Sequence, residues 1–323
     1  MTRTQQRKSP LNMTADLAVY VAVRLVVAVV GIFSIEQCRE AAVFLSWLFT
    51  HVIPIRRKTI HENLHASFPN LTPREEKRLT RKMWEHLLLM GAEFFAAHRM
   101  FHKENWCLYI EAEQAQEMVR LFFQDRPLLM VTGHFGNFEV GGYTLGLLGY
   151  PTFSIARKLD NPFLNRYIEK LRAETGQYII DKNEGIEDIF RVIEGNGRIA
   201  FLADQSAGPK GCWVDFFGRP ASAYKAIALF SRRYHAPILV CSISRVNNTP
   251  MRFRIEPIGF YDPLDPPEGL DSVFEITQWF TSLLERRIRQ DPEQYWWLHR
   301  RWKTYGKNIS LDTIHRKIRY KLP

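Results

Sequence analysis

Cysteine is scarce in this chain of 323 residues, which has only four copies. Cys38, Cys107, Cys212 and Cys241 lie far apart, and none belongs to a C-x-x-C pair. Disulfide frameworks are typical of small secreted domains with closely spaced cysteines. The pattern therefore excludes a disulfide-stapled scaffold, and we expect reduced thiols in a cytosolic compartment.

Acidic residues are also in short supply. The chain has 34 Asp plus Glu against 44 Lys plus Arg, a formal net charge of +10. Such a balance predicts acidic partners, which are nucleic acid, anionic lipid or an acidic carrier protein. Eight Trp and 22 Phe favour lipid, because aromatic and basic residues together suit a membrane interface. No recognised nucleic-acid-binding motif is present, so we expect no nucleic acid partner.

The sequence has no long apolar run free of charge. Residues 17–35 are almost wholly apolar but contain Arg24, and a central Arg costs about 2.5–3.5 kcal/mol on insertion scales. A second run, residues 41–55, is too short to span a bilayer comfortably. Basic clusters flank both runs, namely Arg3, Arg7 and Lys8 before them and Arg56, Arg57 and Lys58 after them.

A single span would place one of these basic clusters on each side of the membrane, which the positive-inside rule disfavours. An interfacial or re-entrant helix pair keeps both clusters on the cytoplasmic face. We expect membrane attachment, with the single span and the interfacial pair both open. No small-residue cleavage site follows the first run, so a removable signal peptide is not expected.

The remaining pattern predicts an α/β protein. Residues 1–58 are expected to form membrane-associating helices, 59–126 a helical subdomain with helices at 56–68 and 73–101, 127–305 an α/β core, and 306–323 a basic tail. In the core, strands are expected at 128–132, 152–156, 178–180, 198–203, 237–244 and 251–258, the last one antiparallel. Helices are expected at 137–148, 161–175, 185–194, 221–234 and 271–289. This alternation predicts a mostly parallel central sheet flanked by helices.

The segment Gly133-His134-Phe135-Gly136-Asn137-Phe138-Glu139 joins a buried strand to a helix. Open α/β sheets place their sites beyond the carboxyl ends of strands. A histidine with an orienting acid is what proton removal from an alcohol requires. The helix N-terminus also offers free N–H groups, which suit an oxyanion or a phosphate.

The five-residue spacing of His134 and Glu139 proves little alone. With 10 His and 34 acids, about one such pair is expected by chance. On a regular helix, residues five apart point roughly 140° apart, so a tight turn at Gly136 is needed to bring Glu139 back to the ring. A capped structural turn with a hydrogen-bonded histidine is the alternative.

Two further segments follow predicted strand ends. Arg157, with Lys158, could bind a phosphate or a thioester oxygen, and Asp204 could orient Arg157 or an acceptor hydroxyl. Gln205 lies beside Asp204. The alternatives are a solvated basic loop and ordinary turn chemistry.

His61-Glu62-Asn63-Leu64-His65 matches the H-E-x-x-H zinc signature, and Glu85 lies downstream at a plausible distance for a third ligand. The motif lies in a short helix beside the basic run, which Pro69 ends almost at once. A solvated helix face is the better interpretation, and no metal is expected.

Residues 294–303 mix Trp with cations. They are expected either to anchor the chain at an interface or cover the site, or to pack against the core.

Together these motifs resemble the lipid A biosynthesis acyltransferases, the lauroyl/myristoyl transferase branch of the lysophospholipid acyltransferase superfamily. The resemblance covers roughly residues 15–305. Its marks, in order, are residues 63–69 (NLHASFP), 133–139 (GHFGNFE), 157–162 (RKLDNP), 203–205 (ADQ), 217–220 (FGRP) and 294–303 (QYWWLHRRWK). No single mark is decisive, but six in the right order are specific. The first also accounts for the zinc-like match, which it overlaps.

The resemblance implies an enzyme at the cytoplasmic face of the bacterial inner membrane. It would move an acyl chain from acyl-carrier protein, or coenzyme A, to a hydroxyl of a lipid A precursor, with no cofactor and no covalent acyl-enzyme. His134 would be the general base and Glu139 its orienting acid. Gly136, Asn137 and nearby backbone N–H groups would help to place the tetrahedral intermediate. Arg157 would bind a substrate phosphate or the thioester oxygen, and Asp204 and Gln205 would shape the acceptor site.

Two departures from the family pattern matter. Many members have an acid where this chain has Ser206, which bears on the acceptor, and Arg24 interrupts the N-terminal apolar run. Another glycolipid or a lysophospholipid as acceptor, water as acceptor in a thioesterase, and a catalytically silent lipid-binding protein are the alternatives.

Overall fold

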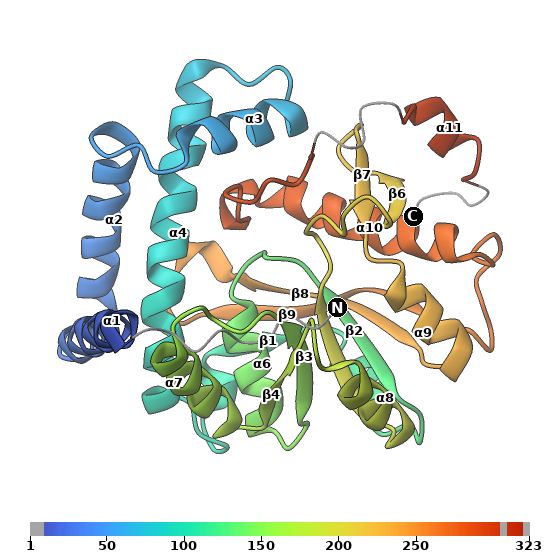
Figure 1. Cartoon of the computed structure of the whole chain (residues 1–323), viewed down its shortest axis with the longest axis horizontal. Coiled ribbons are helices and arrows are strands. Elements are labelled where there is room, and N and C mark those ends of the chain that lie inside the picture. The colour runs from blue at the N-terminus through green and yellow to red at the C-terminus, as the bar shows by residue number, and fades with distance from the viewer. Residues whose placement is uncertain (1–9, 304–308, 319–323) are drawn as a thin grey trace.

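A seven-stranded sheet forms the middle layer of the protein in this computed structural model, which describes residues 10–303 and 309–318 (Figure 1). The strand order is β1-β9-β8-β2-β5-β3-β4, and every neighbouring pair is parallel except β8 with β9. The strands are β1 (Ile110–Ala112), β2 (Leu128–Thr132), β3 (Thr152–Ala156), β4 (Gln177–Asp181), β5 (Arg198–Leu202), β8 (Ile238–Arg245) and β9 (Phe253–Tyr261). The predicted fold class, including the antiparallel partner strand, is confirmed.

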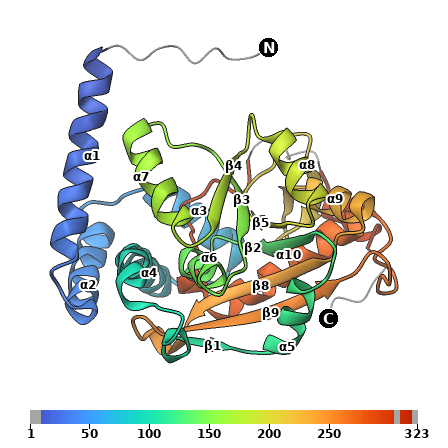
Figure 2. The same ribbon diagram turned by 90° about the horizontal axis from the view of Figure 1, so that it is seen from below.

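The alternation of side chains along β2 explains how both faces of the sheet become buried. Leu128 and Met130 pack toward α4, α5 and α6, whereas Leu129 and Val131 pack toward α8, α9 and α10. The helices of the two outer layers are α4 (Pro73–Met100), α5 (Ala115–Phe122), α6 (Phe138–Leu147), α8 (Ile186–Glu194), α9 (Ala226–Tyr234) and α10 (Val273–Gln290). Figure 2 shows the sheet between them.

The N-terminal helices stand beside this core. α2 (Ile35–His51) and α4 both begin with a capping box, at Ser34 and Thr72 respectively, and α2 packs along α4. α3 (Arg57–Ser67) follows. α1 (Pro10–Val30) is seen end-on in Figure 1, whereas α2 is seen from the side. Its segment Asn12–Val30 is long and apolar enough to cross a membrane, and that segment is not buried in the protein.

Arg24, which interrupts the apolar sequence of α1, faces a helix of the core. Its Nη1 donates to the Tyr20 hydroxyl at 2.9 Å, and its guanidinium lies 4.6 Å from the ring centre of Tyr167 in α7 (Pro162–Ala173). Asn161 also donates to the Asp16 carbonyl at 2.7 Å. The charge in the apolar run therefore has partners within the protein.

Several elements differ from the prediction. The first part of the predicted helix 221–234 belongs to a hairpin of β6 (Cys212–Asp215) and β7 (Pro220–Ala223), and α9 starts only at Ala226. β1 precedes residue 127 yet joins the sheet through β9. In the predicted basic tail, α11 (Leu311–His315) packs against β6, while residues 306–308 and 319–323 lie outside the described residues. Three short 3-10 helices complete the described chain, at Trp106–Leu108, Val246–Asn248 and Pro292–Gln294.

Candidate active site

His134 lies in the turn between β2 and α6, at the carboxyl end of a central strand. β5 pairs with β2 along its whole length, so the residues that follow Leu202 in β5 come beside those that follow Thr132 in β2. The Ala203 amide donates to the Thr132 carbonyl at 2.8 Å and extends this pairing past the strand ends. Two sequence segments 70 residues apart thus meet at one edge of the sheet.

Asp204 is the carboxylate that reaches His134. Its Oδ1 lies 2.8 Å from Nδ1 of the ring, and its Oδ2 accepts the His134 backbone N–H at 3.0 Å. Burial by itself would raise the pKa of Asp204, but the His134 imidazole and the hydrogen bonds from His134 outweigh it and hold that pKa well below its usual range. An ionised Asp204 fixes the proton of the neutral ring on Nδ1 and leaves Nε2 as the acceptor.

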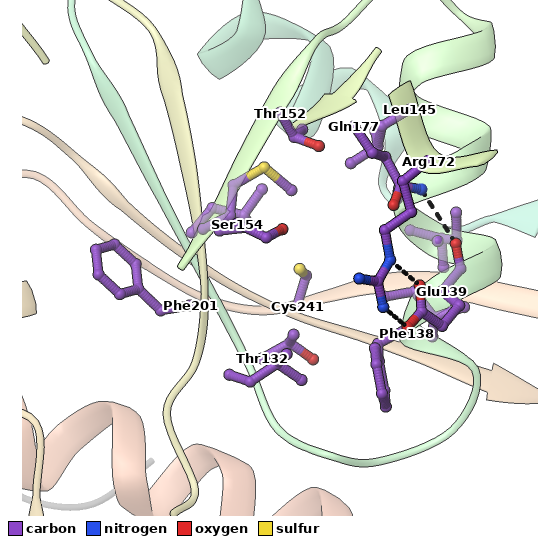
Figure 3. A pocket seen from close by; sticks show the side chains of 18 of the residues that line it. Thr132, Phe138, Glu139, Leu145, Thr152, Ser154, Arg172, Gln177, Phe201 and Cys241 are labelled. Atoms are coloured by element: carbon purple, nitrogen blue, oxygen red, sulfur yellow. Dashed lines mark hydrogen bonds and ion pairs between the residues drawn. The ribbon is translucent and has the colours of Figure 1, made fainter. Parts of the chain in front are cut away.

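Glu139 does not contact His134 in the structure. It lies in the first turn of α6 and forms a two-point ion pair with Arg172 of α7, in which Nε donates to Oε2 at 3.0 Å and Nη2 donates to Oε1 (Figure 3). Asp204 therefore takes the place predicted for Glu139. The reason is that α6 continues as a regular helix after Asn137, so Glu139 points away from the turn that holds His134.

The turn itself is clamped to its neighbours. The Gly136 amide donates to the Gln294 carbonyl and the Asn137 amide donates to the Ile243 carbonyl, each at 2.9 Å. Gly136 has φ +60°, and a Cβ there would lie 1.6 Å from the Ile243 oxygen, so only glycine fits. Both amides already donate to carbonyls, so the nearby backbone N–H groups remain as the predicted donors to a tetrahedral intermediate.

Asn137 is fully buried and belongs to a polar network beneath the turn. Its side chain caps α6 by accepting the Val140 amide and donates to Glu93 at 3.0 Å. Arg245 donates to both oxygens of Glu93 and lies 2.8 Å from Nδ1 of His86. Burial and the Arg245 charge hold the pKa of His86 well below its usual range, and its Nε2 lies 3.2 Å from the Gly136 carbonyl oxygen. This network fixes the turn on α4 and was not predicted.

Gln205, which was predicted to shape the acceptor site, lies next to the ring of His134. Its amide Nε2 is 3.2 Å from Nε2 of His134 and 3.2 Å from Nε2 of His299. The rings of His134 and His299 are 4.7 Å apart, and Trp296 packs on both. Burial first, and then the neighbouring His134, lower the pKa of His299 to about 4. The segment 294–303 therefore forms one wall of the site.

Arg157 lies elsewhere. Its side chain is 67% exposed and pairs with Asp160 at 2.9 and 2.8 Å, while Asp204 is buried against His134. Asp204 therefore does not orient Arg157, because the turn after β3 points into solvent. Phosphate binding by Arg157 stays a prediction.

An apolar pocket opens between the sheet and α6 (Figure 3). Thr132 and Phe138 line the part of it beside His134, whose ring lies 5.5 Å from that of Phe138, and the Glu139–Arg172 pair lines its rim. Met118 and Phe122 of α5 and Ile255 of β9 also line it. Such a cavity has the chemistry to hold a hydrocarbon chain. Burial raises the pKa of Cys241, another lining residue, to about 12, so this thiol stays protonated.

The zinc-like motif forms a different cluster from the one its spacing indicated. Nδ1 of His61 and Nε2 of His65 lie 2.9 and 3.1 Å from the two oxygens of Glu76, which is the third member of the cluster in place of Glu85. Glu85 instead accepts from Lys82 and Asn248. Hydrogen bonds within the cluster account for its geometry and tie α3 to α4.

A histidine hydrogen-bonded to a buried carboxylate, beside an apolar pocket, suits an enzyme that modifies a lipid. The sequence profile of the bacterial lipid A biosynthesis acyltransferases matches residues 5–304, and the chain belongs to that family. It is therefore a transferase that acylates a lipid A-type substrate.

Among curated relatives, the chain is 24% identical over 259 residues to the lipid A biosynthesis lauroyltransferase of Escherichia coli, covering 79% of this chain and 81% of the relative. It is also 24% identical over 257 residues to the palmitoleoyltransferase of the same organism, covering 77% and 79%. A crystal structure of 1-acyl-sn-glycerophosphate acyltransferase from Thermotoga maritima aligns with a TM-score of 0.38 at 16% identity, over 82% of this chain and all of that one.

Proposed function

We propose that this acyltransferase moves a fatty acyl chain from a thioester of acyl-carrier protein, or of coenzyme A, to a hydroxyl of a lipid A precursor. The observation that carries the proposal is the His134–Asp204 pair beside Phe138, a residue that lines the apolar pocket. The pocket holds the donor chain, so the thioester carbonyl stands beside Nε2. The net charge of +10 suits an acidic carrier protein as the source of that thioester.

In the proposed reaction, Nε2 of His134 takes the proton of the acceptor hydroxyl as its oxygen attacks the thioester carbonyl. A carbon–oxygen bond forms, and the buried Asp204 carboxylate stabilises the imidazolium. When the tetrahedral intermediate collapses, the carbon–sulfur bond breaks and the imidazolium returns its proton to the departing thiolate. The products are an ester and a free thiol, and no acyl group is attached to the protein.

The oxyanion of that intermediate needs donors other than the Gly136 and Asn137 amides, which are occupied. The next amides along the chain, those of Phe138 and Glu139, open α6, and the first amides of a helix have no intrahelical acceptor. We assign them the oxyanion, with the positive end of the helix dipole behind them. Glu139 itself holds Arg172 at the rim of the pocket and is assigned the positioning of the donor chain.

The location we propose is the cytoplasmic face of the bacterial inner membrane, with attachment through α1 and α2. Large apolar side chains of both helices are exposed, among them Leu25, Val26, Phe44 and Trp47. An exposed apolar surface of this extent is typical of contact with lipid.

The test is acyl transfer by the full chain in detergent micelles. Wild type and His134→Ala receive acyl-carrier-protein thioesters or acyl-coenzyme A with a lipid A precursor, and products are read by mass spectrometry. Acylated precursor from the wild type, with a loss of about a hundredfold or more in the variant, supports the proposal. Equal transfer by both proteins removes His134 from the mechanism, and release of free fatty acid alone shows a thioesterase.

A further inference from the structure

A basic pocket lies on the other side of Gln205 from His134. Arg56, Arg300 and Lys303 line it together with His299 and Gln205. Arg56 comes from the link between α2 and α3, whereas Arg300 and Lys303 come from the segment after the last 3-10 helix. Three cations from two distant parts of the chain thus converge beside the base.

Among the residues that the structure describes, no carboxylate compensates the charges of Arg56, Arg300 and Lys303. None of the residues that line it is acidic. Within residues 10–303 and 309–318, no ion pair joins Arg56, Arg300 or Lys303 to a carboxylate. By contrast, Arg172 and Arg245, which lie on other elements, are each paired with a glutamate. Unpaired cations gathered in one concavity are typical of a site for an anionic ligand.

The pocket is also held in place. Nη1 of Arg56 donates to the Leu298 carbonyl at 3.2 Å, and the side-chain amide of Asn63 donates to the carbonyls of Trp297 and His299 at 2.7 and 2.6 Å. α3 therefore fixes the segment that carries Arg300 and Lys303. The Arg56 charge also contributes to the low pKa of His299, so the ring facing the pocket is neutral and can hydrogen-bond a ligand.

We propose that Arg56, Arg300 and Lys303 form a phosphate-binding site that positions a phosphorylated substrate against His134. The inference rests on the proposed function and deepens it. Either substrate can supply the phosphate. In the acceptor it is a phosphoryl group on the sugar, and in the donor it is the phosphodiester of the pantetheine arm. Gln205 lies within 3.2 Å of both histidines, so a phosphate bound in the pocket places the atoms attached to it beside Nε2 of His134.

The site also has a consequence for the reaction. His134 becomes positively charged as it takes the proton, and three nearby cations oppose that charge. A bound phosphate cancels this repulsion, so the base works best when the phosphorylated substrate is in place. The proposal therefore predicts that the phosphate speeds the reaction as well as tightening binding.

The experiment uses the full chain in detergent and the variants Arg56→Gln, Arg300→Gln and Lys303→Gln, singly and together. Lys58→Gln is the matched control, since Lys58 follows Arg56 closely and its side chain is 90% exposed. Each protein is assayed with a phosphorylated lipid A precursor or its dephosphorylated form, and with acyl-carrier-protein thioester or acyl-N-acetylcysteamine, which lacks phosphate. Thermal unfolding verifies that the variants are folded.

We expect the triple variant to raise KM at least tenfold for one phosphorylated substrate, with a further fall in kcat, and the control to match the wild type. The phosphate-free analogue of that same substrate should be used equally by the variant and the wild type, which identifies the source of the phosphate. An unchanged KM for both substrates, or a defect that persists with both phosphate-free analogues, overturns the site.

A second readout separates the site from the proposed function. Equilibrium binding of each phosphorylated probe and its phosphate-free form is measured without turnover. If the wild type transfers no acyl group, the proposed function fails. The site is still supported if the wild type binds one phosphorylated probe more tightly than its phosphate-free form and the triple variant does not. Equal binding of the two forms by the wild type overturns the site.

Discussion

Asp204 holds His134 at two points, with one carboxylate oxygen 2.8 Å from the ring Nδ1 and the other 3.0 Å from the backbone nitrogen. The side chain and the backbone of the base are thus positioned by one buried acid. This double contact makes Asp204 the residue through which the geometry of the base is most easily tested.

Asp204→Asn should lower kcat/KM by at least about a hundredfold. An amide in this place can donate to Nδ1 and so favour the wrong tautomer, and it no longer stabilises the imidazolium. Asp160→Asn is the control, because Asp160 is an exposed acid after the neighbouring strand. Steady-state kinetics measure the effect, and an Asp204→Asn enzyme with nearly wild-type activity would show that the pair is not the catalytic one.

Glu139 and Arg172 should behave as one unit. Removal of either leaves the other charge partly buried without its partner, so Glu139→Ala and Arg172→Ala should each reduce activity. The double variant should be no worse than the more damaging single variant, a coupling of about 1 kcal/mol or more in a double-mutant cycle. Strong coupling of Glu139→Ala with His134→Ala, and none with Arg172→Ala, would return Glu139 to the role predicted from the sequence.

His299 should make the protein less stable in mild acid. Its pKa is lowered from 6.5 to about 4 in the folded state. Between pH 4 and 6.5, His299 is therefore protonated in the unfolded chain but mostly neutral in the folded one. The free energy of unfolding should therefore fall as pH falls from 6.5 to 4, by at most about 3 kcal/mol from this group. The ionised Asp204 carboxylate, whose pKa is lowered in the folded state, also stabilises the fold. That stabilisation is lost only below about pH 4, outside the pH range in which His299 acts.

Urea unfolding in detergent across that pH range measures the slope. His299→Gln stays neutral in both states and should have a flatter dependence than the wild type. His102→Gln, at an exposed position, should keep the wild-type slope. Parallel curves for wild type and His299→Gln would show that His299 is not held in its neutral form.

Gly136→Ala should unfold the protein or abolish activity. The new Cβ would meet the Ile243 carbonyl and occupy a left-handed backbone, with an expected loss of at least about 3 kcal/mol. Gly218→Ala is a matched control with a similar φ of +69° but no atom within 4 Å of the new Cβ, and it should cost only about 1–2 kcal/mol. Equal losses of unfolding free energy in the two variants would mean that the clamp on the turn is not tight.

The sequence was sufficient to place the candidate residues at strand ends, but it did not indicate which acid contacts His134. Periodicity located β2 and β5, and with them His134 and Asp204, because buried strands bounded by turns leave a local signature. Which strands are neighbours depends on packing across the whole sheet, so nothing local indicated that β5 lies beside β2. The family resemblance implied Glu139 as the orienting acid, yet α6 continues as a regular helix and Glu139 pairs with Arg172.

The short elements were missed for a similar reason. β6 and β7 have four residues each, too few for an alternating pattern to stand out from a turn-rich segment. His299 lay within a segment whose Trp and Arg content indicated packing or a cover, and only the fold shows that its ring faces His134.

The bridge from Asn63 to Trp297 and His299 joins parts of the chain more than 230 residues apart. During synthesis α1 and α2 leave the ribosome first and can reach the bilayer while most of the sheet is still unmade. The wall of the site that carries His299 leaves after every strand that supports His134. With the membrane attachment proposed above, the chain therefore meets lipid before its site is complete, because the site closes only when the segment with Trp297 and His299 docks onto α3.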